Sequence, residues 1–411
     1  MISKMKKTYR HIGYWLCSIL MLLLCQACGS SEQEVVPGPG PDNPNVPEPS
    51  SLEIYVYTPE HPVVSRGDTG FAEPEEQERV VHSLDIWVFE HATGDYVGHL
   101  SPNVSSSFEG GTYQLSVTDD FAKNPPNVDV FVMVNVSVGN TGLNLGAPSR
   151  NDLLGAKILH NGTQDFFGVT TLTTEPSEAL GLPMSGVLID QPVVGNQPLL
   201  KVEDKVKVQR IVSKVRFVFS RTDTGEDEVF KITGIKLDNG KVPKAEYLFL
   251  NPPAGHTKHH VDAGAGYESG TDETGIPLVT AEIDVPVSTY PAKYAYNPDD
   301  AGQLKGQDYE ELIDRGISGT DNNGVPELVQ VGRYYLRESD QQMTGTISYK
   351  VGTRTGSASF SMSAAGDFSR NHTWIVYGYY AGKETLKVVS VETKNWITLA
   401  DDQVDYPIPN W

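Results

Sequence analysis

Histidine and acidic side chains gather in one glycine-rich stretch, GHTKHHVDAG, where they lie close enough together to suggest metal chemistry. The stretch contains His256, His259, His260 and Asp262, whose imidazole and carboxylate groups are ligands that zinc accepts. Their spacing matches no helix face, and the surrounding glycines offer no rigid scaffold. We therefore expect a surface loop here and no zinc site.

Two acidic clusters, Asp223–Glu228 and Asp299–Asp300, consist of the residue type that binds calcium. Neither has the spacing of a calcium loop that ends in a bidentate glutamate, so we expect solvated turns. The sequence has no G-x-S-x-G elbow and no phosphate-binding P-loop, and its last cysteine is Cys28. We predict that the protein is not an enzyme and uses no cofactor.

The charge balance argues against one class of partner. The 411 residues carry a formal net charge of −21, and no basic stripe occurs anywhere along the chain. A strongly acidic surface repels nucleic acid, because the phosphate backbone attracts clustered lysine and arginine. We therefore expect no nucleic-acid partner.

The amino terminus has the features of an export signal. Basic residues precede a mostly apolar run over 12–24, and Ala27 lies directly before Cys28. This pattern resembles a bacterial lipoprotein signal, in which residues 1–27 are removed and Cys28 is acylated, for example with palmitate. The position three before Cys28 is Cys25 and not leucine. The alternative is an ordinary signal peptide that is cut near Ala27.

The residues that follow the signal predict a tether without disulfides. All three cysteines, Cys17, Cys25 and Cys28, lie in the targeting region, so no thiol pair remains for the rest of the chain. Residues 28–51 are rich in proline, a composition that favours an extended, semi-rigid linker.

The remaining chain predicts an all-β protein. Its structured runs are short, alternating and rich in Val, Ile, Thr and Tyr, and a near-continuous apolar run at 128–138 indicates a central strand covered on both faces. Helical periodicity is confined to short stretches at 149–159 and 307–315. A break rich in proline and glycine near 190–198 suggests a boundary between an N-terminal β domain, 52–195, and a C-terminal one, 196–411.

One segment of the first domain combines an isolated strand with a candidate protease site. Leu52, Ile54 and Val56 share one face of a predicted strand, and Arg66 and Gly67 follow in a polar connection. Connections of this composition are where proteolytic nicking concentrates. Arg66-Gly67-Asp68 is also a tripeptide that integrins read, but a cut after Arg66 would destroy it.

Several landmarks in order along the chain resemble one family. The chain is similar to the FimA-like fimbrillins of Bacteroidetes, the type V pilins, and most closely to their shaft-type major subunit precursors. The resemblance includes the lipoprotein start, the early strand and the arginine before Gly67. Further landmarks are Phe131–Asn135, Pro183–Gly186, Val208–Phe217, Arg333–Ser339, Ser369–Trp374 and a short tail that ends at Trp411.

The resemblance implies a fold and an assembly route. It implies two β-sandwich-like, transthyretin-like domains with short helical insertions, behind the signal and the tether. The precursor would be held in the outer membrane through the lipid on Cys28. An Arg-specific extracellular protease would then cut between Arg66 and Gly67 and remove residues 52–66.

The resemblance also implies how the subunits join and what the fibre does. Each subunit would donate its tail, about 396–411, to the groove of another, and the resulting cell-surface fimbria would support adhesion. The donor side chains would be Trp396, Ile397, Leu399, Val404, Tyr406, Ile408 and Trp411.

One departure and two alternatives remain open. Pro407 and Pro409 lack the N–H group that a ladder needs, and residues two apart face the same edge, so this end of the tail is expected to pair along one edge only. The chain is alternatively an anchor or accessory subunit that keeps its lipid. A third possibility is a stand-alone surface lipoprotein that binds glycans by stacking them on Trp87 or Trp374.

Overall fold

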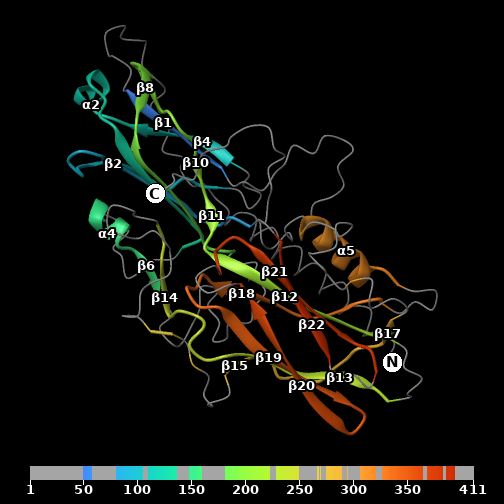
Figure 1. The fold of residues 1–411 in the computed structure, drawn as a ribbon. Coiled ribbons are helices and arrows are strands. Elements are labelled where there is room, and N and C mark those ends of the chain that lie inside the picture. Colours follow the sequence, from blue (N-terminus) through green and yellow to red (C-terminus); the bar gives the residue numbers. More distant parts are fainter. Residues whose placement is uncertain are drawn as a thin grey trace, which may run out of the picture. The chain divides into compact units, whose positions relative to one another are not determined.

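The computed structural model describes residues 50–57, 80–104, 110–136, 148–159, 181–222, 228–249, 266–267, 269, 275–288, 294, 306–320, 326–363, 368–382 and 386–393. These residues form β-strands with a few short helices (Figure 1). The predicted all-β class is confirmed. No helix among the described residues is long and apolar enough to cross a membrane.

The first half of the described chain builds two five-stranded sheets. In one, here called sheet A, β1 pairs on one edge with β4 and on the other with β9 and β10, and β9 pairs with β8. The strands of sheet A are β1 (Ser51–Tyr57), β4 (Gly110–Ser116), β8 (Val193–Asn196), β9 (Leu199–Val202) and β10 (Val206–Lys207).

The second sheet, sheet B, has the order β11-β7-β5-β2-β3. Its central strand is β5, and all seven of its residues are buried, as the continuous apolar run predicts. The strands of sheet B are β2 (Leu84–Glu90), β3 (Tyr96–Leu100), β5 (Val128–Val134), β7 (Met184–Gln191) and β11 (Gln209–Arg210).

Sheets A and B share one apolar core, and the other face of sheet B is covered as well. Alternate residues of β2 and β5, such as Ile86 and Val130, pack with the inward side chains of sheet A. The residues between them, such as Trp87 and Phe131, pack in a second cluster with Leu153 and other side chains. Short elements of this half and of the connection that follows are α2 (Asp119–Lys123), α4 (Arg150–Leu154), β6 (Lys157–Leu159) and β14 (Ala245–Tyr247).

The second half repeats the plan of two sheets around one core. One sheet has the order β17-β12-β21-β22 with β18 on β12, and the other has the order β15-β13-β19-β20 with β16 on β13. The bounds are β12 (Val212–Thr222), β13 (Phe230–Leu237), β15 (Ile276–Val279), β16 (Ile283–Asp284), β17 (Val287–Ser288), β18 (Val329–Arg337), β19 (Met343–Val351), β20 (Arg354–Met362), β21 (Thr373–Tyr380) and β22 (Lys387–Thr393).

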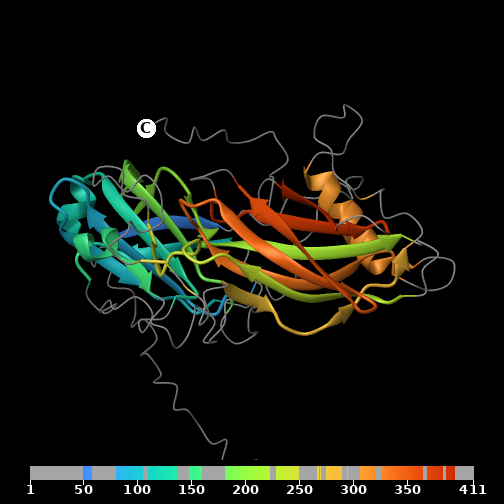
Figure 2. The same cartoon turned by 60° about the horizontal axis from the view of Figure 1, so that its bottom comes forward.

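Helix α5 (Gly306–Ser318) covers the outer face of the β12 sheet. Tyr309 and Ile313 of the helix pack in one buried cluster with Val218 and Tyr377 of the sheet, and Figure 2 shows the helix against β22. Both predicted helical stretches are present, the first as the short α4 with a capping box at Ser149.

The chain passes from the first pair of sheets to the second between Arg210 and Val212. Strands β8 to β11 lie on both sides of the expected boundary at residue 195, and all four pair within sheets A and B. The proline and glycine break near 190–198 therefore connects strands inside the first half. Its role is local, because it joins β7 to β8 and β8 to β9.

Candidate functional site

Strand β1 is the feature of the structure that fits the predicted strand exchange, because it is the first described element and lies inside a sheet. It pairs antiparallel with β4 over all seven of its residues. On its other edge it runs parallel to β9 and to β10. Among the described residues, β1 is the only strand that pairs with β4.

The inward face of β1 carries the three predicted side chains. Leu52, Ile54 and Val56 are each 0% exposed and belong to the core between sheets A and B. The alternation that the sequence shows is therefore the alternation of the folded strand. Loss of β1 would leave three neighbouring apolar positions empty.

The hydrogen bonds at the ends of β1 assign its backbone groups to the two edges. The Ser51 N–H donates to Pro198 O at 2.8 Å, and Tyr57 O accepts from the Val208 N–H at 3.0 Å. Odd-numbered residues therefore face the β9–β10 edge. Ser50 O accepts from the Val117 N–H at 2.9 Å, so even-numbered residues face β4.

The outward face of β1 is aromatic and lies beside lysines. The ring centroids of Tyr55 and Tyr57 are 6.1 Å apart, and the Lys205 ammonium lies 4.7 Å from the centroid of the Tyr55 ring. Lys201 is the register partner of Glu53, and Lys207 is that of Tyr57. Partial desolvation lowers the pKa of Lys207, because burial disfavours its charged form. Three lysines, Lys201, Lys205 and Lys207, therefore lie along this edge of β1.

Asn135 secures the chain just before β2. Its side-chain amide donates to Val80 O at 2.7 Å and to Leu182 O at 2.9 Å, and its carbonyl oxygen accepts from the His82 N–H at 2.7 Å. Asn135 has a φ of 57°, which asparagine adopts more readily than other residues that carry a side chain. An asparagine directly after a buried strand was the available sequence signal for this clamp.

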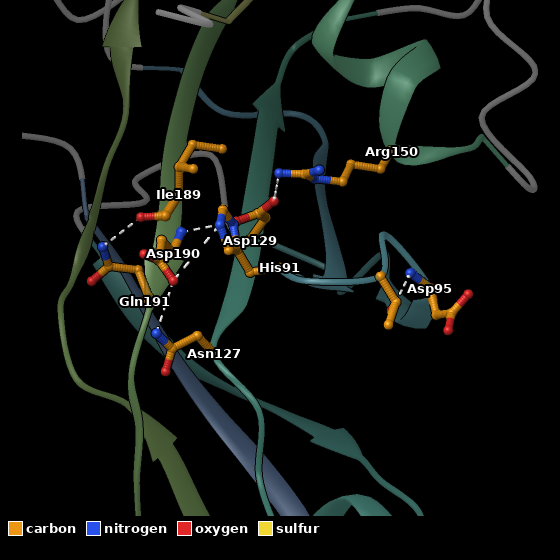
Figure 3. Close-up of polar contacts among 9 residues, drawn as sticks. His91, Asp95, Asn127, Asp129, Arg150, Ile189, Asp190 and Gln191 are labelled. Atoms are coloured by element: carbon orange, nitrogen blue, oxygen red, sulfur yellow. Dashed lines mark hydrogen bonds and ion pairs between the residues drawn. The ribbon is translucent and has the colours of Figure 1, made fainter. Parts of the chain in front are cut away.

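A polar cluster fixes the far end of sheet B (Figure 3). Asp129 is 0% exposed, and one of its oxygens contacts His91 Nδ1 at 2.7 Å and the Asp190 N–H at 2.8 Å. Its other oxygen pairs with the Arg150 guanidinium. The contacts of Asp129 with Arg150, His91 and the Asp190 backbone make this cluster an ion pair reinforced by hydrogen bonds. No group of three or more candidate metal ligands occurs among the residues described.

The two tryptophans proposed as glycan platforms are not available for stacking. Trp87 is 0% exposed and stacks on His99, with centroids 4.7 Å apart and planes 8° apart. Trp374 is 6% exposed and packs on Phe368. The stacking hypothesis is wrong for these two rings because both are buried in the protein.

The other predicted site residues lie outside the described residues. They are Cys28, Arg66, Gly67, the tail from Trp396 to Trp411, and the histidine and acidic cluster from His256 to Asp262. Asp223 and the Asp299–Asp300 pair are also outside, and Glu228 is described and pairs with Arg354 at 2.9 Å.

The walls beside β1 are the part of the site that the sequence did not reveal. These walls are β4 on one side and the β9–β10 edge on the other. The signal for the second wall was the alternation of Leu200, Val202, Val206 and Val208, whose side chains are all buried in the core. This alternation is hard to recognise in the sequence, because three residues separate β9 from β10 and shift the register between the two strands.

The fold and this site together define an all-β, sandwich-type protein in which β1, the first strand of the described residues, lies inside a sheet. No family model matches the sequence, and no curated protein matches it.

Solved structures of fimbrial proteins are similar to the chain. They include the fimbrilin FimA of Porphyromonas gingivalis, at 13% identity over 85% of this chain and 98% of that one with a TM-score of 0.46. The tip fimbrial protein Mfa3 of the same species matches at 12% identity, 84% and 99% coverage and a TM-score of 0.40. A fimbrial assembly protein of Parabacteroides distasonis matches at 13% identity, 83% and 95% coverage and a TM-score of 0.38.

These neighbours belong to the class that the sequence resemblance predicts.

Proposed function

We propose that this protein is a structural subunit of a cell-surface fimbria, and that β1 is a temporary strand which the tail of another subunit replaces. The observation that carries the proposal is the position of β1. The first strand of the described chain fills the middle of sheet A, between β4 and β9–β10.

A strand in the middle of a sheet can be removed without breaking the rest of the chain only if it lies near a terminus. Strand β1 meets this condition, because Arg66 follows it and every other strand among the described residues comes later in the sequence. A single cut after Arg66 would leave β1 held by packing and hydrogen bonds alone, while the residues from Gly67 onward remain one chain.

The energetic consequence of losing β1 favours replacement. Burial of one aliphatic side chain contributes about 1.5–3 kcal/mol, so Leu52, Ile54 and Val56 together contribute roughly 5–9 kcal/mol. Removal would also open two strand edges with unpaired N–H and C=O groups. An incoming strand with the same alternation of apolar residues restores both the side-chain burial and the backbone hydrogen bonds. Strand addition gains affinity from these hydrogen bonds and specificity from the side-chain pockets.

The rest of the proposed route follows from the sequence. Cys28 carries the lipid that holds the precursor at the outer membrane, and an Arg-specific extracellular protease cuts between Arg66 and Gly67. The tail, about 396–411, then supplies the incoming strand, so the partners are other fimbrial subunits. Adhesion would be a property of the assembled fibre.

The test compares two arginine substitutions. Arg66→Ala is expected to prevent processing and to leave a monomer that retains β1. Arg354→Ala is the matched control, since Arg354 is an exposed arginine at the end of a hairpin, and it should process and polymerise normally. Electron microscopy and amino-terminal sequencing of the surface protein provide the readout. Normal fibres from Arg66→Ala would overturn the cleavage mechanism.

The same sequencing distinguishes the anchor alternative. A surface protein that begins at acylated Cys28 and keeps residues 52–66 would be a lipid-retaining base subunit. A protein that begins at Gly67 would be a subunit whose groove has been opened.

A further inference from the structure

We infer the register in which the tail of a second copy occupies the groove: Val404, Tyr406 and Ile408 take the places of Leu52, Ile54 and Val56, and Asp405 takes the place of Glu53 beside Lys201. This inference rests on the proposed function. It specifies which part of the tail enters and which residues recognise it.

The inward face of β1 restricts the register first. Three alternating positions with 0% exposure need three alternating apolar side chains. A shift of two residues would place Asp402 or Asn410 in one of these positions, and a shift of one would turn Asp405 inward. Ile397 and Leu399 provide only two apolar positions before Asp401. Val404, Tyr406 and Ile408 are the set that fits.

The direction of the tail follows from its prolines. With Val404 at the position of Leu52 and the same direction as β1, Pro407 and Pro409 stand at the positions of Tyr55 and Tyr57. These positions face the β9–β10 edge. A tail in the opposite direction would turn both prolines toward β4, where the ladder is continuous over seven residues.

The β9–β10 edge is interrupted where Pro407 would lie. Ser51 pairs with Leu199, and Val56 pairs with Val206. The difference in residue number between partners therefore changes from 148 to 150, so the β9–β10 edge contains two more residues than β1 over this stretch. The register pairs on this edge cover 51–53 and 56–57 and leave out Tyr55. A proline at that position therefore removes no ladder donor, and only Pro409 does.

Charge supports the same register. Glu53 is the parallel register partner of Lys201, an exposed lysine, and Asp405 would keep a carboxylate at that place. Lys205 and Lys207 follow on the same edge, and two acids, Glu203 and Asp204, lie between them and Lys201. Opposite charges across neighbouring strands stabilise pairing, so Lys201 favours a tail with an acidic residue at the position of Glu53.

Cysteine pairs test the register, because the chain has no cysteine after Cys28. Register partners on neighbouring strands lie about 4.8 Å apart, within disulfide reach, whereas positions two residues away lie about 8 Å apart. Lys201→Cys is combined with Asp405→Cys, or with Gln403→Cys or Pro407→Cys as matched controls. Glu53→Cys with Lys201→Cys in the uncut chain verifies that this pair of positions can form the bond.

The purified full chains are cut with an Arg-specific protease, oxidised, and separated on non-reducing gels. We expect a ladder of linked subunits from the Asp405→Cys pair and at least fivefold less from either control. Fibres that link through residue 403 or 407, or through none of the three, would overturn the register and leave the proposed function standing. If even the unsubstituted cut chain forms no fibres, both fail.

Discussion

Truncation of Ile54 should separate a temporary strand from a permanent one. Ile54 of β1 and Ile86 of β2 are both 0% exposed, and both contact the same core between sheets A and B. Replacing a buried isoleucine with alanine costs about 2–5 kcal/mol. In the uncut precursor, Ile54→Ala and Ile86→Ala are therefore expected to lower the free energy of unfolding by similar amounts.

The fibre should distinguish the two variants. If β1 leaves during assembly, Ile54 is absent from the finished fibre, and Ile54→Ala fibres should be as stable as the unsubstituted ones. Ile86 stays in the subunit, so Ile86→Ala should weaken precursor and fibre alike. After the cut, a weaker β1 also leaves faster, so Ile54→Ala should assemble at least as quickly.

Two measurements check this pair. Urea unfolding followed by tryptophan fluorescence gives the precursor stabilities, and the temperature at which fibres dissociate in detergent gives the fibre stabilities. The reasoning is refuted if Ile54→Ala lowers the fibre dissociation temperature as much as Ile86→Ala does, because that result would place β1 permanently in the subunit.

Two further predictions concern buried charges. Burial raises the pKa of Glu246 from 4.5 to about 8 against the opposing charge of Arg370, so the stability it contributes is complete below pH 4.5 and is lost as pH rises through 8. Glu246→Gln should thus be more stable than the unsubstituted chain at pH 8, by about 1–3 kcal/mol, and this gain should vanish near pH 4.5. The measurement is the thermal unfolding midpoint of both chains as a function of pH. Parallel pH profiles of the two chains would contradict the prediction. Asp129→Ala should lower the free energy of unfolding by about 3 kcal/mol, because it leaves Arg150 without its buried partner. Asp129→Asn should cost less, the exposed Asp120→Ala should cost nothing measurable in urea unfolding, and equal losses from all three would be the contrary result.

The sequence predicted those features of β1 that depend on neighbouring residues. Alternation over Leu52–Tyr57 is a local pattern, and it defines which side chains face inward whatever the partner strand is. The continuous run of β5 likewise predicted cover on both faces, and the two buried clusters of sheet B confirm it. The same double cover explains why Trp87, on the second face of β2, is part of the core.

The partners of β1 could not be predicted in this way. Ile54 pairs with Tyr113, and Leu52 lies beside Leu200, so the walls of the groove come from distant parts of the chain. Strand pairing over such separations is decided by the whole core and not by the residues of either strand. The composition near 190–198 does not distinguish a turn inside a sheet from a domain boundary, because both are rich in proline and glycine.

The prolines of the tail show what the structure adds to the sequence. From sequence alone, Pro407 and Pro409 weakened the tail as a donor strand, because two missing N–H groups on one edge suggest poor pairing. In the structure, the β9–β10 edge shifts register beside Tyr55. A proline at the position of Tyr55, which Pro407 would occupy, therefore removes no hydrogen bond from that ladder. Strand β4 is the one neighbour that pairs with β1 over its full length, whereas β9 and β10 each pair with part of it. Among the residues described, β4 has no other strand partner. Any strand that replaces β1 must therefore pair with β4 along its full length. A donor strand that has all of its N–H groups on the β4 edge can carry prolines on the other edge.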